Sequence, residues 1–179
     1  MKNIIAAISI MFFLCGGAYA QGTGVLIAEG TYLSAYADGG NDAYAVLGKL
    51  DPNSLIYASE AAQVNYNAGD ILAKTLDGLY QEVSDILDIH IKDFKGTIQV
   101  VPDSQSLSDY FKMAYNIDFN ELSIYYFQED IIYVSFADLT VGMLGHEIAH
   151  AIISHFFVVP PPAKIQDVLC GYVENALRK

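Results

Sequence analysis

The pentapeptide His146-Glu147-Ile148-Ala149-His150 constrains the fold more than any other feature of the sequence. In an α-helix, residues four positions apart lie one turn apart and about 40° around the axis, so both imidazoles can reach one ion. A strand or an irregular loop would not bring the two rings together in this way. The spacing therefore predicts that this segment is helical and that it carries a metal site.

Zinc is the ion that these residue types favour. Neutral imidazole is a common zinc ligand, and a zinc ion with three protein ligands keeps a fourth position for water. Glu147 lies about 60–100° around the helix from the histidines, too far to complete the chelate but close enough to contact that water. We therefore expect one Zn²⁺ per chain, held by His146 and His150, with Glu147 as the general base that activates the zinc-bound water for hydrolysis of a peptide bond.

The last helix is expected to supply the third ligand. Pro160-Pro161-Pro162 ends the helix that contains the two histidines. A chain that turns back there brings a residue five or six positions into the return helix level with His150. Asp167 fits this spacing. Glu174 is the alternative, either as a ligand or as a residue that orients a histidine without touching the metal. Cys170 lies between them and could bind zinc as a thiolate, although a small core residue is the simpler interpretation.

Hydrophobic periodicity places this pair of helices in a mixed α and β chain. A long amphipathic helix is predicted from Asp70 to about Asp88, and a strand at Thr97–Val101 precedes a short helix capped by Ser104 or Ser106. Two β-rich runs within Leu122–Val134 predict a hairpin. Ser135 is the predicted N-cap of the helix that contains the two histidines.

The N-terminus predicts export. Residues 1–20 combine Lys2, an apolar run and the small-residue site Ala18-Tyr19-Ala20, which is typical of a signal peptide cleaved near Ala20. We therefore expect a periplasmic or secreted protein with no membrane span after cleavage. Residues 21–69 are expected to form an N-terminal lobe of unknown role, in a single compact domain with the catalytic region at 70–179. A net charge of −12 argues against a nucleic-acid partner.

Two segments resemble those of gluzincin-type zinc metallopeptidases. They are Gly145–Ala151 and Gln166–Glu174, and the second is similar to an E-G-L-A-x-Y-x-E pattern whose first glutamate binds zinc and falls on Asp167. The resemblance implies a zincin-like α+β fold with a small, mostly antiparallel sheet, and peptide or protein substrates that pair with an edge strand within Leu122–Val134. A catalytically degenerate zinc-binding or protein-interaction domain with the same fold is the alternative.

Overall fold

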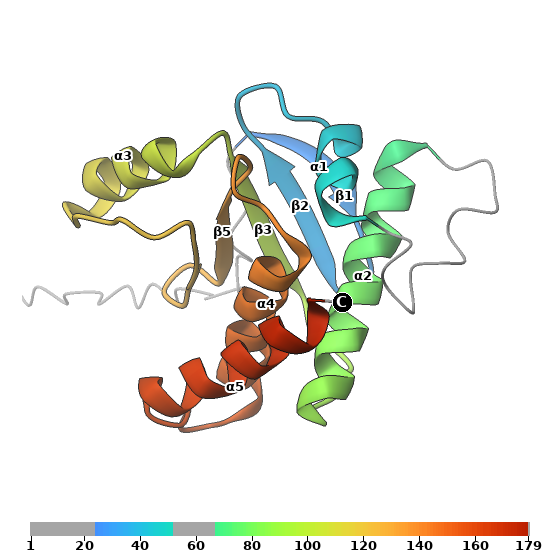
Figure 1. Ribbon diagram of the computed structural model, residues 1–179, viewed down its shortest axis with the longest axis vertical. Coiled ribbons are helices and arrows are strands. Elements are labelled where there is room, and N and C mark those ends of the chain that lie inside the picture. Colours follow the sequence, from blue (N-terminus) through green and yellow to red (C-terminus); the bar gives the residue numbers. More distant parts are fainter. Residues whose placement is uncertain (1–23, 52–66, 179) are drawn as a thin grey trace, which may run out of the picture.

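A computed structural model describes residues 24–51 and 67–178, which form a five-stranded sheet covered by helices (Figure 1). The predicted signal peptide at 1–20 and part of the predicted N-terminal lobe lie outside the described residues. The elements in chain order are β1 (Val25–Glu29), β2 (Leu33–Ala37), α1 (Ala43–Leu50), α2 (Ala68–Leu87), β3 (Gly96–Val101), α3 (Ser104–Tyr115), β4 (Ser123–Tyr126), β5 (Ile131–Ser135), α4 (Val141–Phe156) and α5 (Ala163–Leu177).

The sheet is mixed, with strand order β1-β2-β3-β5-β4. The pairs β2/β3 and β3/β5 are parallel, whereas β1/β2 and β4/β5 are antiparallel. The prediction of an α+β chain is confirmed, but the prediction of a mostly antiparallel sheet is wrong. The physical reason for the pair β2/β3 is that α1 and α2 lie between the two strands, and a helical crossover returns the chain in the same direction. After β3 the chain passes through α3 into β4, and the β4–β5 hairpin then reverses it, so that β5 runs parallel to β3. Residues 24–50, for which the sequence indicated no role, supply two of the five strands.

Both faces of the sheet are buried, and side chains alternate between two clusters along β5. Ile132 and Val134 join the larger cluster, which includes the apolar sides of α2, α4 and α5. Ile131 and Tyr133 join a smaller cluster with Leu107 and Phe111 of α3 on the other face. Because successive strand residues point to opposite faces, this alternation fixes the register of β5.

The predicted helices are present, but two of their predicted caps are wrong. The N-cap of α3 is Asp103, whose carboxylate accepts from Ser106 N–H, rather than Ser104 or Ser106. The N-cap of α4 is Thr140, whose side chain accepts from Met143 N–H at 3.1 Å. Ser135 instead ends β5 and its hydroxyl donates to Asp138. A cap needs extended backbone directly before the helix, and the segment between Ser135 and Thr140 is a turn that the strand-to-helix transition requires.

The predicted hairpin is confirmed as β4 and β5, with β4 at the edge of the sheet. The helix α5 packs along α4 with Cys170, Val173 and Leu177 buried. No helix among the described residues is long and apolar enough to cross a membrane.

Candidate metal centre

Helix α4 presents His146 and His150 side by side at the surface of the protein. Leu144, Ile148 and Ile152 recur every fourth residue on the buried side of the helix and anchor it in the main core. The two imidazole centroids lie 5.0 Å apart with their planes inclined by 52°. Both rings are only partly buried, so each keeps a side that is accessible from the cleft in front of α4. Burial lowers the pKa of His150, which favours the neutral imidazole that a metal ion needs.

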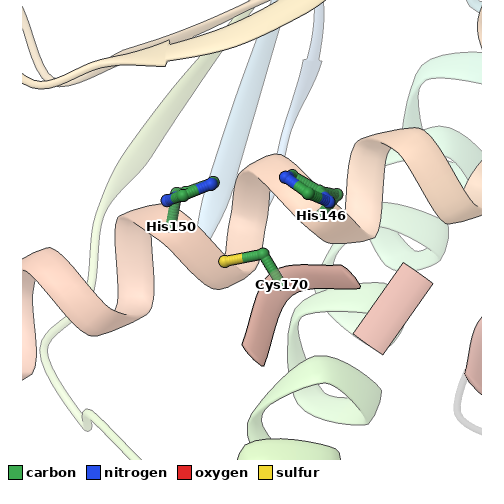
Figure 2. Close-up of side chains that lie close together, drawn as sticks. All are labelled: His146, His150 and Cys170. Carbon is green, nitrogen blue, oxygen red and sulfur yellow. The ribbon is translucent and has the colours of Figure 1, made fainter. Parts of the chain in front are cut away.

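Helix α5 brings Cys170 against the two histidines. Figure 2 shows the Cys170 side chain reaching toward α4 from α5, and one ligand atom from each of His146, His150 and Cys170 lies within 4.8 Å of the others. Cys170 is fully buried, and burial is the largest effect that raises the pKa of its thiol to about 12. The nearby charges of Glu147 and Asp167 raise this pKa further. The thiol is therefore neutral at physiological pH in the metal-free protein.

Two carboxylates of α5 approach the histidines, but at different ring nitrogens. Asp167 Oδ1 lies 3.7 Å from His150 Nε2, and the Asp167 side chain is 66% exposed. Glu174 Oε2 lies 3.3 Å from His146 Nδ1, although the two groups are not aligned for a hydrogen bond. Nδ1 of His146 is therefore a buried nitrogen with no hydrogen-bond partner among the described residues. Glu174 also pairs with Arg178, one turn further along α5.

Glu147 points toward the edge strand β4. Its side chain is only 7% exposed, and burial raises the pKa of the carboxyl group. Ser123 Oγ donates to Glu147 Oε1 at 2.7 Å, and the backbone N–H of Tyr125 donates to Oε2 at 2.7 Å. Each carboxylate oxygen thus has one donor from β4, and these two hydrogen bonds oppose the effect of burial on the pKa.

The free edge of β4 borders the same cleft. Ser135 N–H donates to Leu122 O, so alternate residues from Leu122 onward face β5. In an antiparallel ladder, the residues between them turn both backbone groups away from the partner strand. Ser123 and Tyr125 therefore present their backbone N–H and C=O groups at the free edge. Ser123, Tyr125, His146, Glu147, His150 and Asp167 all line one cavity of about 460 Å³.

The remaining two described histidines lie outside this centre. His155 Nε2 lies 2.8 Å from Asp130 Oδ1, and the His155 ring packs edge-on against Phe94. His90 is exposed near the end of α2, with Nε2 3.8 Å from Asp85.

Four of the predicted site residues thus line one cleft, and the structure adds partners that the sequence did not indicate. His146, His150, Glu147 and Asp167 line the cavity, while Glu174 lines a second cavity that shares His146 and Glu147 with the first. The contacts of Ser123 and Tyr125 with Glu147 were missed, because the hairpin was predicted only as a range. Comparisons with protein-family models, with curated proteins and with solved structures gave no match for this chain.

Proposed function

We propose that this chain is a zinc-dependent metallopeptidase with a zincin-like arrangement of its helices and edge strand. The observation that carries the proposal is the convergence of two histidines, a carboxylate and a separate buried glutamate on one cleft bordered by a free strand edge. Two histidines from one helical turn, a third ligand from a second helix and a glutamate that is not a ligand are the parts of a hydrolytic zinc site. Export to the periplasm or the medium stays a prediction from residues 1–20.

The donor set fits zinc. Two ligands that each lie about 2.1 Å from a tetrahedral ion are separated by roughly 3.4 Å. The distance of 3.7 Å from Asp167 Oδ1 to His150 Nε2 needs only a small adjustment to meet this value. Nitrogen and oxygen donors with one negative charge are typical of catalytic zinc sites, and the lowered pKa of His150 keeps its lone pair available.

Asp167 and Glu174 differ in the role that their positions support. Asp167 approaches Nε2 of His150, the nitrogen furthest from the helix backbone and next to the cleft. Glu174 approaches Nδ1 of His146, a buried nitrogen with no hydrogen-bond partner among the described residues. A carboxylate beside the second nitrogen of a ligand histidine fixes its tautomer and ring orientation. We therefore assign Asp167 as the third ligand and Glu174 as the residue that orients His146.

The reaction that these residues support is hydrolysis of a peptide bond. A zinc ion at this site would polarise the substrate carbonyl and lower the pKa of a water molecule. Glu147 accepts a proton from the attacking water and transfers it to the leaving nitrogen, for which its raised pKa suits it. The backbone groups of Ser123 and Tyr125 that do not pair with β5 would pair with an extended substrate and give affinity without requiring a particular sequence, with Tyr125 N–H exchanging its bond to Glu147 for one to the substrate.

A catalytically degenerate zinc-binding or interaction domain is the second candidate. Two observations favour it. Both oxygens of Glu147 already accept hydrogen bonds from β4, and Asp167 reaches one methylene less far than the glutamate found at this position in the resembling pattern. Such a domain would keep the metal and the fold but would not turn over substrate.

Zinc content and hydrolysis measured together decide between these functions. The chain is purified, loaded with zinc and desalted, and its metal content is compared with its cleavage of a dye-quenched unfolded protein. We expect one zinc per chain in the wild type and in Glu147→Gln, with hydrolysis lowered at least about 100-fold in the variant, as expected for loss of a general base. Asp109→Asn, on α3 and far from the cleft, is the control for surface charge.

The possible outcomes are distinct. Bound zinc without any cleavage by the wild type would favour the degenerate domain. Failure to bind zinc would contradict both candidate functions.

A further inference from the structure

The structure ties the carboxylate of Glu147 to alternate residues of a single strand edge. Ser123 Oγ and Tyr125 N–H each donate to one carboxylate oxygen at 2.7 Å. Glu147 is nearly buried, and a buried charged group that loses a hydrogen bond is left with an uncompensated desolvation penalty. The two donors therefore determine where this carboxylate points.

The two donors differ in whether a bound substrate would compete for their hydrogen bond to Glu147. Tyr125 N–H belongs to the free backbone edge of β4, where an extended peptide adds as a new strand. A substrate carbonyl that pairs with this N–H competes with Glu147 Oε2 for the same hydrogen. Ser123 donates from its side chain, and strand pairing makes no use of that hydroxyl. Once a peptide occupies the edge, the Ser123 hydroxyl is the hydrogen-bond donor that remains on Glu147.

We propose that Ser123 is the positioning residue for Glu147, and that its hydroxyl holds the general base in place while a substrate strand occupies the backbone edge at Tyr125. This inference rests on the proposed function, because it assigns a role within the same site. It adds a residue that neither the helical spacing nor the resemblance indicated. Ser123 contacts Glu147 and is not one of the residues that would hold the metal, so its substitution should leave the metal-binding residues unchanged.

The kinetic test uses Ser123→Ala and Ser123→Thr in the zinc-loaded full chain, with a dye-quenched unfolded protein as substrate. In Ser123→Ala we expect kcat to fall about 10- to 100-fold, the factor that corresponds to one hydrogen bond to a charged group, with KM changed less than about threefold. Ser123→Thr keeps a hydroxyl at the same position and should retain most of the activity. Zinc content should be one per chain throughout, and Ser108→Ala on α3 is the matched serine control.

A second test measures the contact without catalysis. Denaturant midpoints of the metal-free protein are compared for wild type, Ser123→Ala, Glu147→Ala and the double variant. If Ser123 and Glu147 interact, the shift caused by Ser123→Ala is smaller in the Glu147→Ala background than in the wild type. Additive shifts would show that the contact does not exist in solution.

Failure of the inference differs from failure of the proposed function. If the wild type cleaves the substrate and Ser123→Ala has the same kcat, the positioning role is overturned while the peptidase stands. A Ser123→Ala variant that lowers kcat through loss of zinc, or that Ser123→Thr does not rescue, overturns it as well. A wild type that binds zinc but never cleaves removes both proposals together.

Discussion

Conversion of the two α5 carboxylates into amides should lower zinc affinity by unequal factors, Asp167→Asn by more than Glu174→Gln. Structural zinc sites with four protein ligands have an apparent binding free energy of about 10–16 kcal/mol, which corresponds to about 2.5–4 kcal/mol per protein ligand, or roughly 10²- to 10³-fold in affinity. Because the Asp167 side chain is 66% exposed, solvent screens its charge, and the lower end of this range, about 100-fold, applies.

Glu174 should contribute less because it acts through His146. Residues that orient a ligand typically change metal affinity by about 10- to 100-fold. Glu174 also forms an ion pair with Arg178, which partly neutralises its negative charge, so we expect zinc affinity to fall about tenfold in Glu174→Gln. Cys170→Ser should change the affinity by less than about threefold, because a neutral, fully buried thiol is expected to pack rather than to bind the ion.

Competition with a chromophoric chelator at constant pH measures these affinities directly, with Asp109→Asn as the control for net charge. A larger loss in Glu174→Gln than in Asp167→Asn would show that the two roles are reversed. A 100-fold loss in Cys170→Ser would show that the thiolate is the third ligand and would refute the assignment of Asp167.

Two further predictions concern the fold around the site. The hydrogen bond to Asp130 raises the pKa of His155, so Asp130→Asn should lower this pKa toward about 6.5 in an NMR titration. The stabilisation that accompanies a raised histidine pKa is fully present below the pKa of the unfolded state and is lost as the pH rises through the pKa of the folded state. The stability advantage of the wild type over Asp130→Asn should therefore be largest below about pH 6.5 and shrink above it. Both side chains are partly exposed, so this advantage should stay below about 1 kcal/mol, and an advantage that grew with pH would contradict the sign. Ile152→Ala should lower the free energy of unfolding by about 2–5 kcal/mol because the side chain is fully buried, whereas Val168→Ala, at a 65% exposed position, should change it by no more than about 0.5 kcal/mol in denaturant titrations. Equal effects of the two variants would show that α5 packs differently.

The apolar stripe of α5 shows how far periodicity alone could go. Apolar residues recur at helical spacing along α5, but three of them, Ile165, Val168 and Tyr172, are exposed. Their spacing correctly predicted a helix. It could not tell which part of a wide apolar face meets a neighbour, because α5 packs mainly against α4 and, among the described residues, no element covers its other side. Burial on a terminal helix depends on long-range packing, which the local pattern does not contain.

The same distinction separates the predictable part of the site from the rest. The relation between His146 and His150 is set within one helical turn, so the sequence predicted it from spacing alone. The approach of Asp167 depends on where α5 lies against α4. The number of residues in the sequence predicted that Asp167 lies level with His150 along α4, but it could not predict which nitrogen of the His150 ring Asp167 faces. The contact of Ser123 with Glu147 depends on the strand order, because the order β3-β5-β4 places β4 at the edge of the sheet, where it contacts α4.

Helix α4 therefore links three parts of the protein that the chain order keeps apart. Its buried side packs in the core through Leu144, Ile148 and Ile152, which fixes the rotation of the helix about its axis. Once that rotation is fixed, the side chains at 146 and 150 must point into the cleft and the side chain at 147 must point toward β4, about 60–100° away around the helix. A rotation that buried His146 more deeply would also pull Glu147 from Ser123 and Tyr125. The position of Glu147 therefore depends on how α4 packs in the core. A core substitution that rotates α4 should disturb both the metal-binding residues and the Glu147 hydrogen bonds.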